Sequence, residues 1–398
     1  MITVEKALES ILKNRQDFGT EEIPFIESVG RVLKENIVAD RDFPPFNRVS
    51  MDGICVNFNQ FKKGQRSFVI EDVQPAGSAQ KTLQNPKNCL EVMTGAVLPK
   101  NASAVIRYED VTIKNGVATI EVDVIKNGQN IHNQGKDRSL GDILIRKNTL
   151  ISTAEINVLA TVGKFIVKVA KQPKVMIVST GDELVEVDKI PLDYQIRRSN
   201  VYALVSLMNE LKITVKTAHI TDNKPVLKQK IKQFLLDFDV LLFSGAVSKG
   251  KYDFLPEVLE ELGVEKQFHR VAQRPGKPFW FGRVSGTKTT VFAFPGNPIS
   301  TYVNCLVYFY PWYFKSIEVE REQQTAMLIE NVFFKPDLTY FLQVELSIKN
   351  GQLIATPIHG NGSGDLASLI KTDGFIQLPK GRNEFKKGEV FEVIRYRE

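Results

Sequence analysis

Four acidic residues follow predicted strands and could bind a divalent cation. The run Val175–Val178 is short and apolar, as in a buried strand, and the turn after it leads directly to Asp182 and Glu183. Asp222 follows a second such run, and Asp253 ends the segment after a third. Carboxylate oxygens are the ligands that Mg²⁺ prefers, commonly together with substrate phosphates. These positions predict a Mg²⁺ site for a phosphate-bearing ligand.

Glycine turns and basic residues supply the other groups that such a ligand needs. Turns with glycine occur at 179–183, at 244–253 and at 295–298, where the sequence PGNP opens a predicted helix. Glycine lets a backbone approach a ligand closely, and the N–H groups at a helix N-terminus attract anions. The segment 270–277 adds three cations that can neutralise phosphate, Arg270, Arg274 and Lys277.

Strands and helices alternate over 174–315, which is typical of a parallel α/β sheet. The last helix is predicted to begin at Asn297-Pro298 and to end before Pro311. In such a sheet, ligands bind outside the carboxyl ends of the strands. A single Gly or Asp after a strand is more often a turn or cap residue. Four such loops on one edge of the sheet favour a site.

The segments on either side of this α/β region have a different pattern. Residues 3–15 read as an amphipathic helix with Thr3 as its N-cap. Residues 44–145 and 321–398 alternate apolar with polar residues, and each contains an Asn-Gly turn typical of a hairpin, at 115–116 and 350–351. Two mainly β regions are therefore expected around the α/β sheet.

Length and composition exclude several classes of protein. The 398 residues predict more than one domain, and 43% hydrophobic with 25% charged residues is typical of a globular chain. No apolar run has membrane-spanning length and no leader peptide is evident, so a cytoplasmic location without membrane contact is expected. The three cysteines form no zinc or disulfide spacing. The charge of +6 includes no dense basic stripe, which argues against nucleic-acid binding.

A series of motifs in fixed order resembles the MoeA/gephyrin E-domain family of molybdopterin molybdenumtransferases. The motifs are SMDG (50–53), MTGA with LPKNASAV (93–105), NIHNQGKDRSLGD (130–142), STGDEL (179–184), SGAVSKGKYD (244–253), RPGKPFWFG (274–282) and PGNP (295–298). The resemblance is strong up to about residue 315. In the last 80 residues it is looser and depends on the turn at 362–364.

The resemblance implies an enzyme of the final step of molybdenum cofactor synthesis. Such an enzyme inserts molybdate into adenylylated molybdopterin and releases AMP with the help of Mg²⁺. The implied partners are a second copy, in a homodimer whose cleft is shared between subunits, and other proteins of cofactor synthesis.

The implied fold is multidomain, α/β plus β. It has a stalk of helical and extended segments (1–43 and 141–173), an inserted β-rich domain (44–140), a three-layer molybdopterin-binding domain with a parallel sheet (174–320) and a C-terminal β-barrel (321–398).

The resemblance also assigns roles to individual residues. The expected catalytic residues are Glu183, Asp182, Asp253, Asp52 and Thr94, and the first three of these are expected to bind the metal. Asp52, Thr94 and Asp137 are expected to come from the second subunit. The expected substrate- and phosphate-binding residues are Asp137, Thr180, Gly181, Asp222, Ser244, Gly245, Ser248, Arg270, Arg274, Lys277, Pro295, Gly296, Asn297, Pro298 and Ser363.

Several positions depart from the family pattern and leave alternatives open. Ala246 replaces a glycine, Arg197-Arg198 replace Tyr-Asp, and Gln343 stands where an arginine is common. The alternatives are a molybdopterin adenylyltransferase and a non-catalytic binding or anchoring protein on the same scaffold. The inserted β region and the motifs SMDG and MTGA argue against the adenylyltransferase, and the retained acids argue against a pure scaffold.

Overall fold

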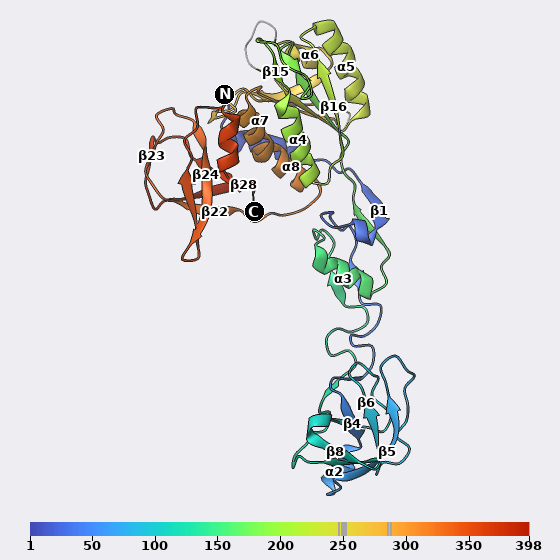
Figure 1. Cartoon of the computed structure of the whole chain (residues 1–398). Coiled ribbons are helices and arrows are strands. Elements are labelled where there is room, and N and C mark those ends of the chain that lie inside the picture. The colour runs from blue at the N-terminus through green and yellow to red at the C-terminus, as the bar shows by residue number, and fades with distance from the viewer. Residues whose placement is uncertain (246, 248–252, 285, 287–288, 398) are drawn as a thin grey trace. The chain divides into compact units, whose positions relative to one another are not determined.

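The computed structural model describes all residues except 246, 248–252, 285, 287–288 and 398. The chain forms two compact units (Figure 1). Unit 1 contains residues 1–34, 148–152 and 166–398, and unit 2 contains residues 35–147 and 153–165. Among the described residues, no helix combines the length and the apolar character needed to cross a bilayer.

A six-stranded sheet forms the centre of unit 1. Its order is β16-β13-β17-β21-β20-β18. The first four strands are parallel to one another, and β20 is antiparallel to both of its neighbours, β21 and β18. The strands are β13 (Val175–Thr180), β16 (Val215–Ile220), β17 (Val240–Ser244), β18 (Val264–His269), β20 (Trp280–Val284) and β21 (Thr290–Phe294). The four predicted parallel strands are thus confirmed. Every residue of β13, β17 and β21 is buried, which explains their continuous apolar runs.

Helices cover both faces of this sheet. One face packs against α1 (Val4–Lys13), α4 (Ser199–Glu210) and α7 (Pro298–Asn304), and the other against α5 (Lys224–Asp237) and α6 (Leu255–Glu261). The predicted cap is confirmed, because the Thr3 hydroxyl accepts a hydrogen bond from the Lys6 N–H. The result is the predicted three-layer α/β/α arrangement.

The prediction that the last helix ends before Pro311 is wrong. A π-helical turn, η3 (Cys305–Phe309), follows α7, and α8 (Tyr310–Ser316) continues directly from it. Pro311 lies in the first turn of α8, where its missing N–H costs no hydrogen bond. The ring of Trp312 is fully buried, with its centroid 5.4 Å from that of Phe292 in the sheet. Aromatic packing therefore stabilises the continued helix.

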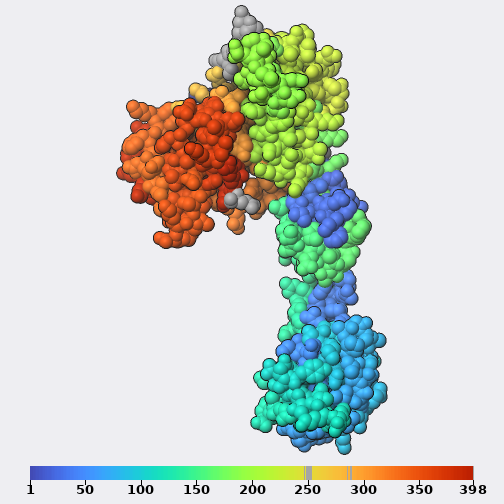
Figure 2. Space-filling model, viewed as in Figure 1, coloured from blue at the N-terminus to red at the C-terminus, as the bar shows by residue number. Residues whose placement is uncertain are grey.

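The C-terminal part of unit 1 is a closed five-stranded barrel. Its strands are β22 (Gln324–Leu328), β24 (Thr339–Lys349), β25 (Gln352–Pro357), β26 (Gly374–Leu378) and β28 (Val390–Arg395). The order β24-β25-β22-β28-β26 closes because β24 also pairs with β26. The turn at 350–351 joins β24 to β25 as predicted. In Figure 2 this barrel is the orange and red part of unit 1, packed beside the green and yellow α/β part.

Short elements complete unit 1. β19 (Gln273–Arg274) adds to β24 of the barrel, and η4 (Leu366–Lys371) precedes β26. β1 (Thr20–Pro24) pairs with β12 (Ile166–Ala170). The other small elements are η1 (Phe25–Glu27) and the pairs of β14 (Leu184–Val185) with β15 (Ile196–Arg197) and of β23 (Val332–Phe333) with β27 (Glu384–Phe385).

Unit 2 is mainly β, as predicted. Its six-stranded sheet has the order β7-β4-β6-β5-β9-β8. The strands are β4 (Gly53–Val56), β5 (Ser67–Gln74), β6 (Cys89–Val92), β7 (Ala104–Arg107), β8 (Val111–Lys114) and β9 (Val117–Ile120). Smaller elements are the strand pairs β3 (Arg48–Val49) with β10 (Ile131–His132) and β2 (Ile37–Val38) with β11 (Ile143–Ile145), and the helices α2 (Phe58–Lys62), η2 (Tyr108–Asp110) and α3 (Thr153–Thr161). The predicted hairpin at 115–116 joins β8 to β9.

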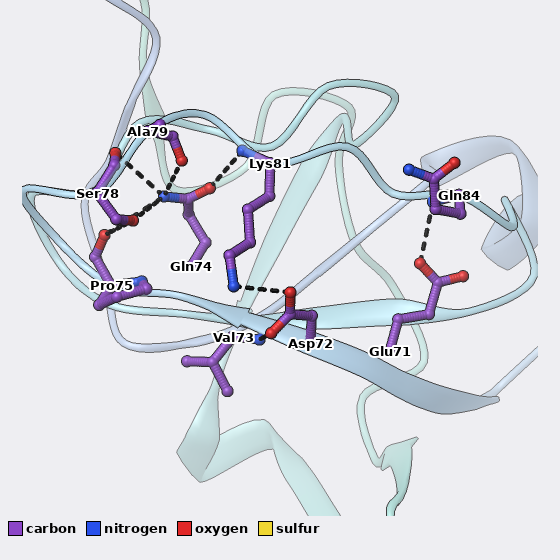
Figure 3. A network of polar contacts seen from close by, with 9 residues as sticks. All are labelled: Glu71, Asp72, Val73, Gln74, Pro75, Ser78, Ala79, Lys81 and Gln84. Atoms are coloured by element: carbon purple, nitrogen blue, oxygen red, sulfur yellow. Dashed lines mark hydrogen bonds and ion pairs between the residues drawn. The ribbon is translucent and has the colours of Figure 1, made fainter.

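A buried glutamine organises the long connection from β5 to β6 (Figure 3). The Gln74 amide donates to Ser78 Oγ at 2.6 Å and to the Ala79 carbonyl at 3.2 Å, and its oxygen accepts from the Lys81 N–H at 2.7 Å. Glu71 accepts from the Gln84 N–H at 2.9 Å. These side-chain contacts add to the backbone hydrogen bonds that Lys81 and Leu83 make with Lys100. We assign these residues a structural role.

Replacement of Gly53 by alanine tests how tightly unit 2 is packed around the SMDG motif. A Cβ on Gly53 would lie 1.9 Å from the backbone oxygen of Ile106 on β7. We expect Gly53→Ala to lower the free energy of unfolding by about 3 kcal/mol, because backbone must move to accept the methyl group. Gly64→Ala is the control, since its φ is +100° but no atom lies within 4 Å. It should cost only about 1 kcal/mol. Urea denaturation of both variants measures the difference, and equal losses would contradict the clash.

Candidate active site

Three loops that follow the parallel strands approach one another at the level of the backbone. Gly245, after β17, has φ +107°, and a Cβ on it would lie 3.1 Å from both the carbonyl oxygen and Oγ1 of Thr180 at the end of β13. Gly296, after β21, is a neighbour of Gly245, since its Cβ would lie 3.8 Å from the Gly245 Cα. Glycine suits position 245 because the backbone is left-handed and its neighbour is close. The predicted turns therefore do meet at one edge.

Asn200, in the first turn of α4, joins two of these loops. Its Nδ2 donates to Ser244 Oγ at 3.0 Å and to the Gly296 carbonyl at 2.7 Å. Both partners are predicted binding residues, and Asn200 itself is not. Its signal in the sequence was weak, because an asparagine at a helix start is usually a cap.

The four predicted acids share one electrostatic environment. Asp182 and Glu183 are exposed, and the Asp222 N–H donates to Asp182 Oδ1 at 3.0 Å. The Glu183 carboxylate lies over Gly181, where a Cβ would be 2.4 Å from Oε2. Burial raises the pKa of Asp222, and the negative charges of Asp182, Glu183 and Asp253 raise it further. Negative charge thus accumulates beside the glycine loops.

These acids fit a cation that is held partly by its ligand. Within the described residues, no three His, Cys, Asp or Glu side chains form a ready metal cage. Mg²⁺ needs no such cage, because it commonly takes one or two carboxylates, water and substrate phosphates. After burial, the neighbouring negative charges contribute to the raised pKa of Asp222, and a cation would relieve this repulsion.

The predicted basic residues lie on the segment between β18 and β20. Arg270 has φ +77°, and its Nε is buried with no hydrogen-bond partner among the described residues. Arg274 and Lys277 are exposed. The Arg274 guanidinium lies 6.0 Å from the ring centroid of Phe334, which belongs to the C-terminal part of the chain. The segment therefore presents positive charge and also contacts the barrel region.

A buried chain of amides fixes this basic segment to α7. Asn304 is fully buried, and its Nδ2 donates to the Gly276 carbonyl at 3.2 Å. Its Oδ1 accepts from Gln273 Nε2 at 2.8 Å, and the Tyr308 hydroxyl donates to Gln273 Oε1. A Cβ on Gly276 would lie 2.5 Å from Asn304 Oδ1. Neither amide had a clear signal in the sequence, since Gln273 lies in the basic segment and Asn304 stands alone in an apolar stretch.

The PGNP turn contacts the C-terminal segment. Asn297 Nδ2 donates to Ser363 Oγ at 2.9 Å, and the Ile299 N–H donates to the Ser363 carbonyl at 3.2 Å. Pro295 is buried and its carbonyl accepts from Thr301 Oγ1, while Pro298 opens α7. Ser363 therefore lies beside the predicted site of the α/β part, although it is 65 residues further along than Pro298.

Unit 2 brings the SMDG and MTGA motifs together. Asp52 Oδ1 accepts from both the Thr94 N–H at 2.6 Å and the Thr94 hydroxyl at 2.8 Å. These two hydrogen bonds lower the pKa of Asp52. Asp137 Oδ1 lies 2.9 Å from His132 Nε2. The three predicted residues of this unit are thus held by local contacts. The predicted Ser248 lies outside the described residues.

Family models match most of the chain. A model of the MoeA N-terminal region (domain I and II) matches residues 2–163, a probable molybdopterin binding domain matches 176–313, and the MoeA C-terminal region (domain IV) matches 325–396. A molybdopterin molybdenumtransferase of Synechocystis sp. is 39% identical, over 98% of this chain and 99% of the relative. The chain belongs to the MoeA family.

Other MoeA-family proteins agree over the full length. A molybdopterin molybdenumtransferase of Staphylococcus epidermidis is 30% identical, over 99% of this chain and 95% of the relative. The crystal structure of a MoeA protein from Pyrococcus horikoshii is similar with a TM-score of 0.84 at 31% identity, over 99% of both chains. The family and the fold class predicted from the motifs are confirmed. The four-domain boundaries stay a prediction.

Two departures from the MoeA pattern have a structural explanation, and Ala246 lies outside the described residues. Arg198 is buried, and its Nη2 lies 3.1 Å from Glu186 Oε2. Burial lowers the pKa of His219, and the charge of Arg198 lowers it further. Gln343 Nε2 donates to Ser368 Oγ at 2.8 Å and to Thr372 Oγ1 at 3.1 Å. Both residues therefore have partners inside unit 1.

The Asp52–Thr94 contact predicts a pH-dependent stability. Because the pKa of Asp52 is lowered in the folded state, its contribution to stability is present above the ordinary Asp value of about 4 and is lost as the pH falls through the folded pKa. Thr94→Val removes the hydroxyl donor. We expect Thr94→Val to melt at a lower temperature than wild type at pH 7, and the difference in melting temperature to shrink below about pH 4. Thermal denaturation from pH 3 to 7 measures this.

The matched control is Thr112→Val, at an exposed strand position of the same unit. Its difference from wild type should not change with pH. A Thr94→Val difference that is equally large at pH 3 and pH 7 would show that the hydroxyl does not act through the charge of Asp52.

Proposed function

We propose that the chain inserts molybdate into adenylylated molybdopterin and releases AMP. Its family makes it a molybdopterin molybdenumtransferase, a transferase of molybdenum cofactor biosynthesis that acts at the molybdate-insertion step. The observation that carries the proposal is the shared edge of the sheet, where glycine loops meet beside four coupled acids.

Each group at this edge suits a step of anhydride cleavage. Cleaving the phosphoanhydride of the adenylylated pterin requires neutralised phosphate charge and an oriented attacking oxygen, with little covalent work by the protein. The backbone around Gly245 and Gly296 allows close approach of the phosphates, and Arg270, Arg274 and Lys277 supply positive charge. Glu183, which is exposed at the end of β13, is the residue that would orient water or molybdate.

Mg²⁺ is the proposed cofactor. Asp182, Glu183 and Asp253 would hold it, and when bound it would neutralise charge on the phosphate oxygens. Asp182 also fixes the neighbouring loop through its hydrogen bond with the Asp222 N–H.

A homodimer with a shared site is the proposed assembly. Asp52, Thr94 and Asp137 belong to unit 2, whereas the acids and glycine loops belong to unit 1. The family resemblance implies that unit 2 of one copy supplies its residues to unit 1 of the other. Association with other proteins of cofactor synthesis is compatible with this arrangement.

Replacement of Glu183 tests the catalytic assignment. We expect Glu183→Gln to lower kcat for molybdate-dependent AMP release by about 10²–10³-fold, because a charge that orients the reacting group is removed at nearly constant volume. AMP release from adenylylated molybdopterin with Mg²⁺, with and without molybdate, is the measurement.

The control is Glu265→Gln, on the exposed edge of β18, which should retain wild-type activity. Full activity of Glu183→Gln would contradict the assignment. Adenylylation of molybdopterin by the wild type would support the adenylyltransferase alternative. Ligand binding without turnover would support the anchoring alternative.

Mixing two inactive variants tests the shared site. Glu183→Ala and Asp52→Ala chains are each expected to be inactive when alone. If a site combines Glu183 of one chain with Asp52 of the other, each mixed dimer has one intact site, so random mixing should restore about a quarter of wild-type activity. Co-expression with two different affinity tags isolates the mixed dimer. No recovery in that dimer would contradict a shared site.

A further inference from the structure

A chain of polar contacts in unit 2 connects Asp137 to β3. Arg48 Nη2 lies 3.1 Å from His132 Nδ1, and His132 Nε2 lies 2.9 Å from Asp137 Oδ1. Arg48 and His132 are directly opposite each other in the β3–β10 pair. The imidazole therefore bridges a guanidinium and a carboxylate.

The chemistry of the two partners determines the tautomer of His132. A guanidinium only donates hydrogen bonds, so Nδ1 must accept and carries no proton. An ionised carboxylate only accepts, so Nε2 must carry the proton and donate it. One neutral form, with hydrogen on Nε2, satisfies both contacts. The imidazolium form would direct an N–H at the Arg48 guanidinium and lose that contact.

Backbone hydrogen bonds fix the main chain at Asp137. The Asp137 N–H donates to the Phe43 carbonyl at 2.8 Å, and the Gly135 N–H donates to the Pro44 carbonyl at 3.0 Å. Asp137 Oδ2 makes no hydrogen bond within the described part of the chain. One oxygen is thus fixed and the other is available to a ligand.

The same short strand also connects to the second acid of unit 2. Val49, next to Arg48, donates its N–H to the Ala96 carbonyl at 2.9 Å and accepts from the Gly95 N–H at 2.9 Å. Gly95 follows Thr94, which binds Asp52. Both predicted acids of unit 2 are therefore positioned from β3, Asp52 by way of Thr94 and Asp137 by way of His132.

We propose that His132 is a positioning residue that orients Asp137 as a neutral imidazole with hydrogen on Nε2, itself oriented by Arg48. The inference adds a residue and its protonation form to the proposed function and rests on it for the role of Asp137. The orientation leaves Oδ2 available to accept a hydrogen bond from the substrate.

The tautomer can be measured directly, because the chain has only four histidines. Full-length protein with nitrogen-15-labelled histidine should give four imidazole patterns in two-bond proton–nitrogen correlation spectra, and loss of one pattern in His132→Gln assigns it. At neutral pH the His132 pattern should be that of hydrogen on Nε2, and Arg48→Met, which removes the donor, should shift it toward a mixture. Hydrogen on Nδ1, an imidazolium, or no response to Arg48→Met would overturn the proposal.

Kinetics separates positioning from a purely structural role. We expect His132→Ala to raise KM for adenylylated molybdopterin about threefold to tenfold, because one hydrogen bond to a charged group is lost, with a smaller change in kcat. His132→Gln keeps a donor near the Nε2 position and should recover most of the loss. His359→Gln, at an exposed histidine far from this chain of contacts in sequence, is the control. Equal KM values for wild type and His132→Ala would overturn the proposal.

Replacement of Asp137 separates its own role from that of His132. If Asp137→Asn leaves activity unchanged, the proposed role of Asp137 is wrong, whatever form His132 adopts. If Asp137→Asn is impaired but the spectra show a different tautomer, the proposed function stands and the positioning by His132 is wrong.

Discussion

The close approach of Gly245 to the end of β13 is the constraint on which the site depends. A Cβ on Gly245 would crowd Thr180 at 3.1 Å and would need a left-handed backbone, so glycine lets the loops after two neighbouring strands lie close together. Gly296 extends this contact to the third loop, and Asn200 cross-links two of the loops. These contacts fix the loops near the exposed acids relative to one another.

The buried amides extend this rigidity to the basic segment. Asn304 and Gln273 satisfy each other and the Gly276 carbonyl inside an apolar core, where an unpaired amide would be costly. The same segment pairs with the barrel through β19, so its cations are positioned from two sides. The basic residues of segment 270–277 and the acids beside the glycine loops are therefore held by separate parts of unit 1. This separation hinders direct ion pairs between them in the absence of a ligand.

Local patterns in the sequence predicted much of this arrangement. The four apolar runs form parallel strands as predicted. Because the carboxyl ends of parallel strands meet at one edge of the sheet, the loops after them were also predicted to lie there. Asn115-Gly116 forms the predicted hairpin turn and Thr3 the predicted N-cap. Both depend only on residues close by in the sequence. The coupling of Asp222 with the other acids followed from the same topology. Asp52 and Thr94 were selected through the resemblance alone.

Other features depend on contacts that no local pattern encodes. Asn200 has partners 44 and 96 positions away, and an isolated amide in a helix has no periodic signal. A proline ends most helices, but Pro311 directly follows a π-helical turn and the helix continues as α8. The basic segment lies between β18, at the edge of the sheet, and β20, and its charged residues gave no strand signal for either.

The pairing of β1 with β12 has a consequence for how the protein is made. Thr20 pairs with Ala170, and all of unit 2 lies between them in the chain. On a ribosome that adds about 5–20 residues per second, β1 must wait roughly eight to thirty seconds for its partner. The six strands of the unit 2 sheet all lie between Gly53 and Ile120, so that sheet can form during this interval. Unit 2 can thus be assembled during translation while the unit that contains the glycine loops is still incomplete.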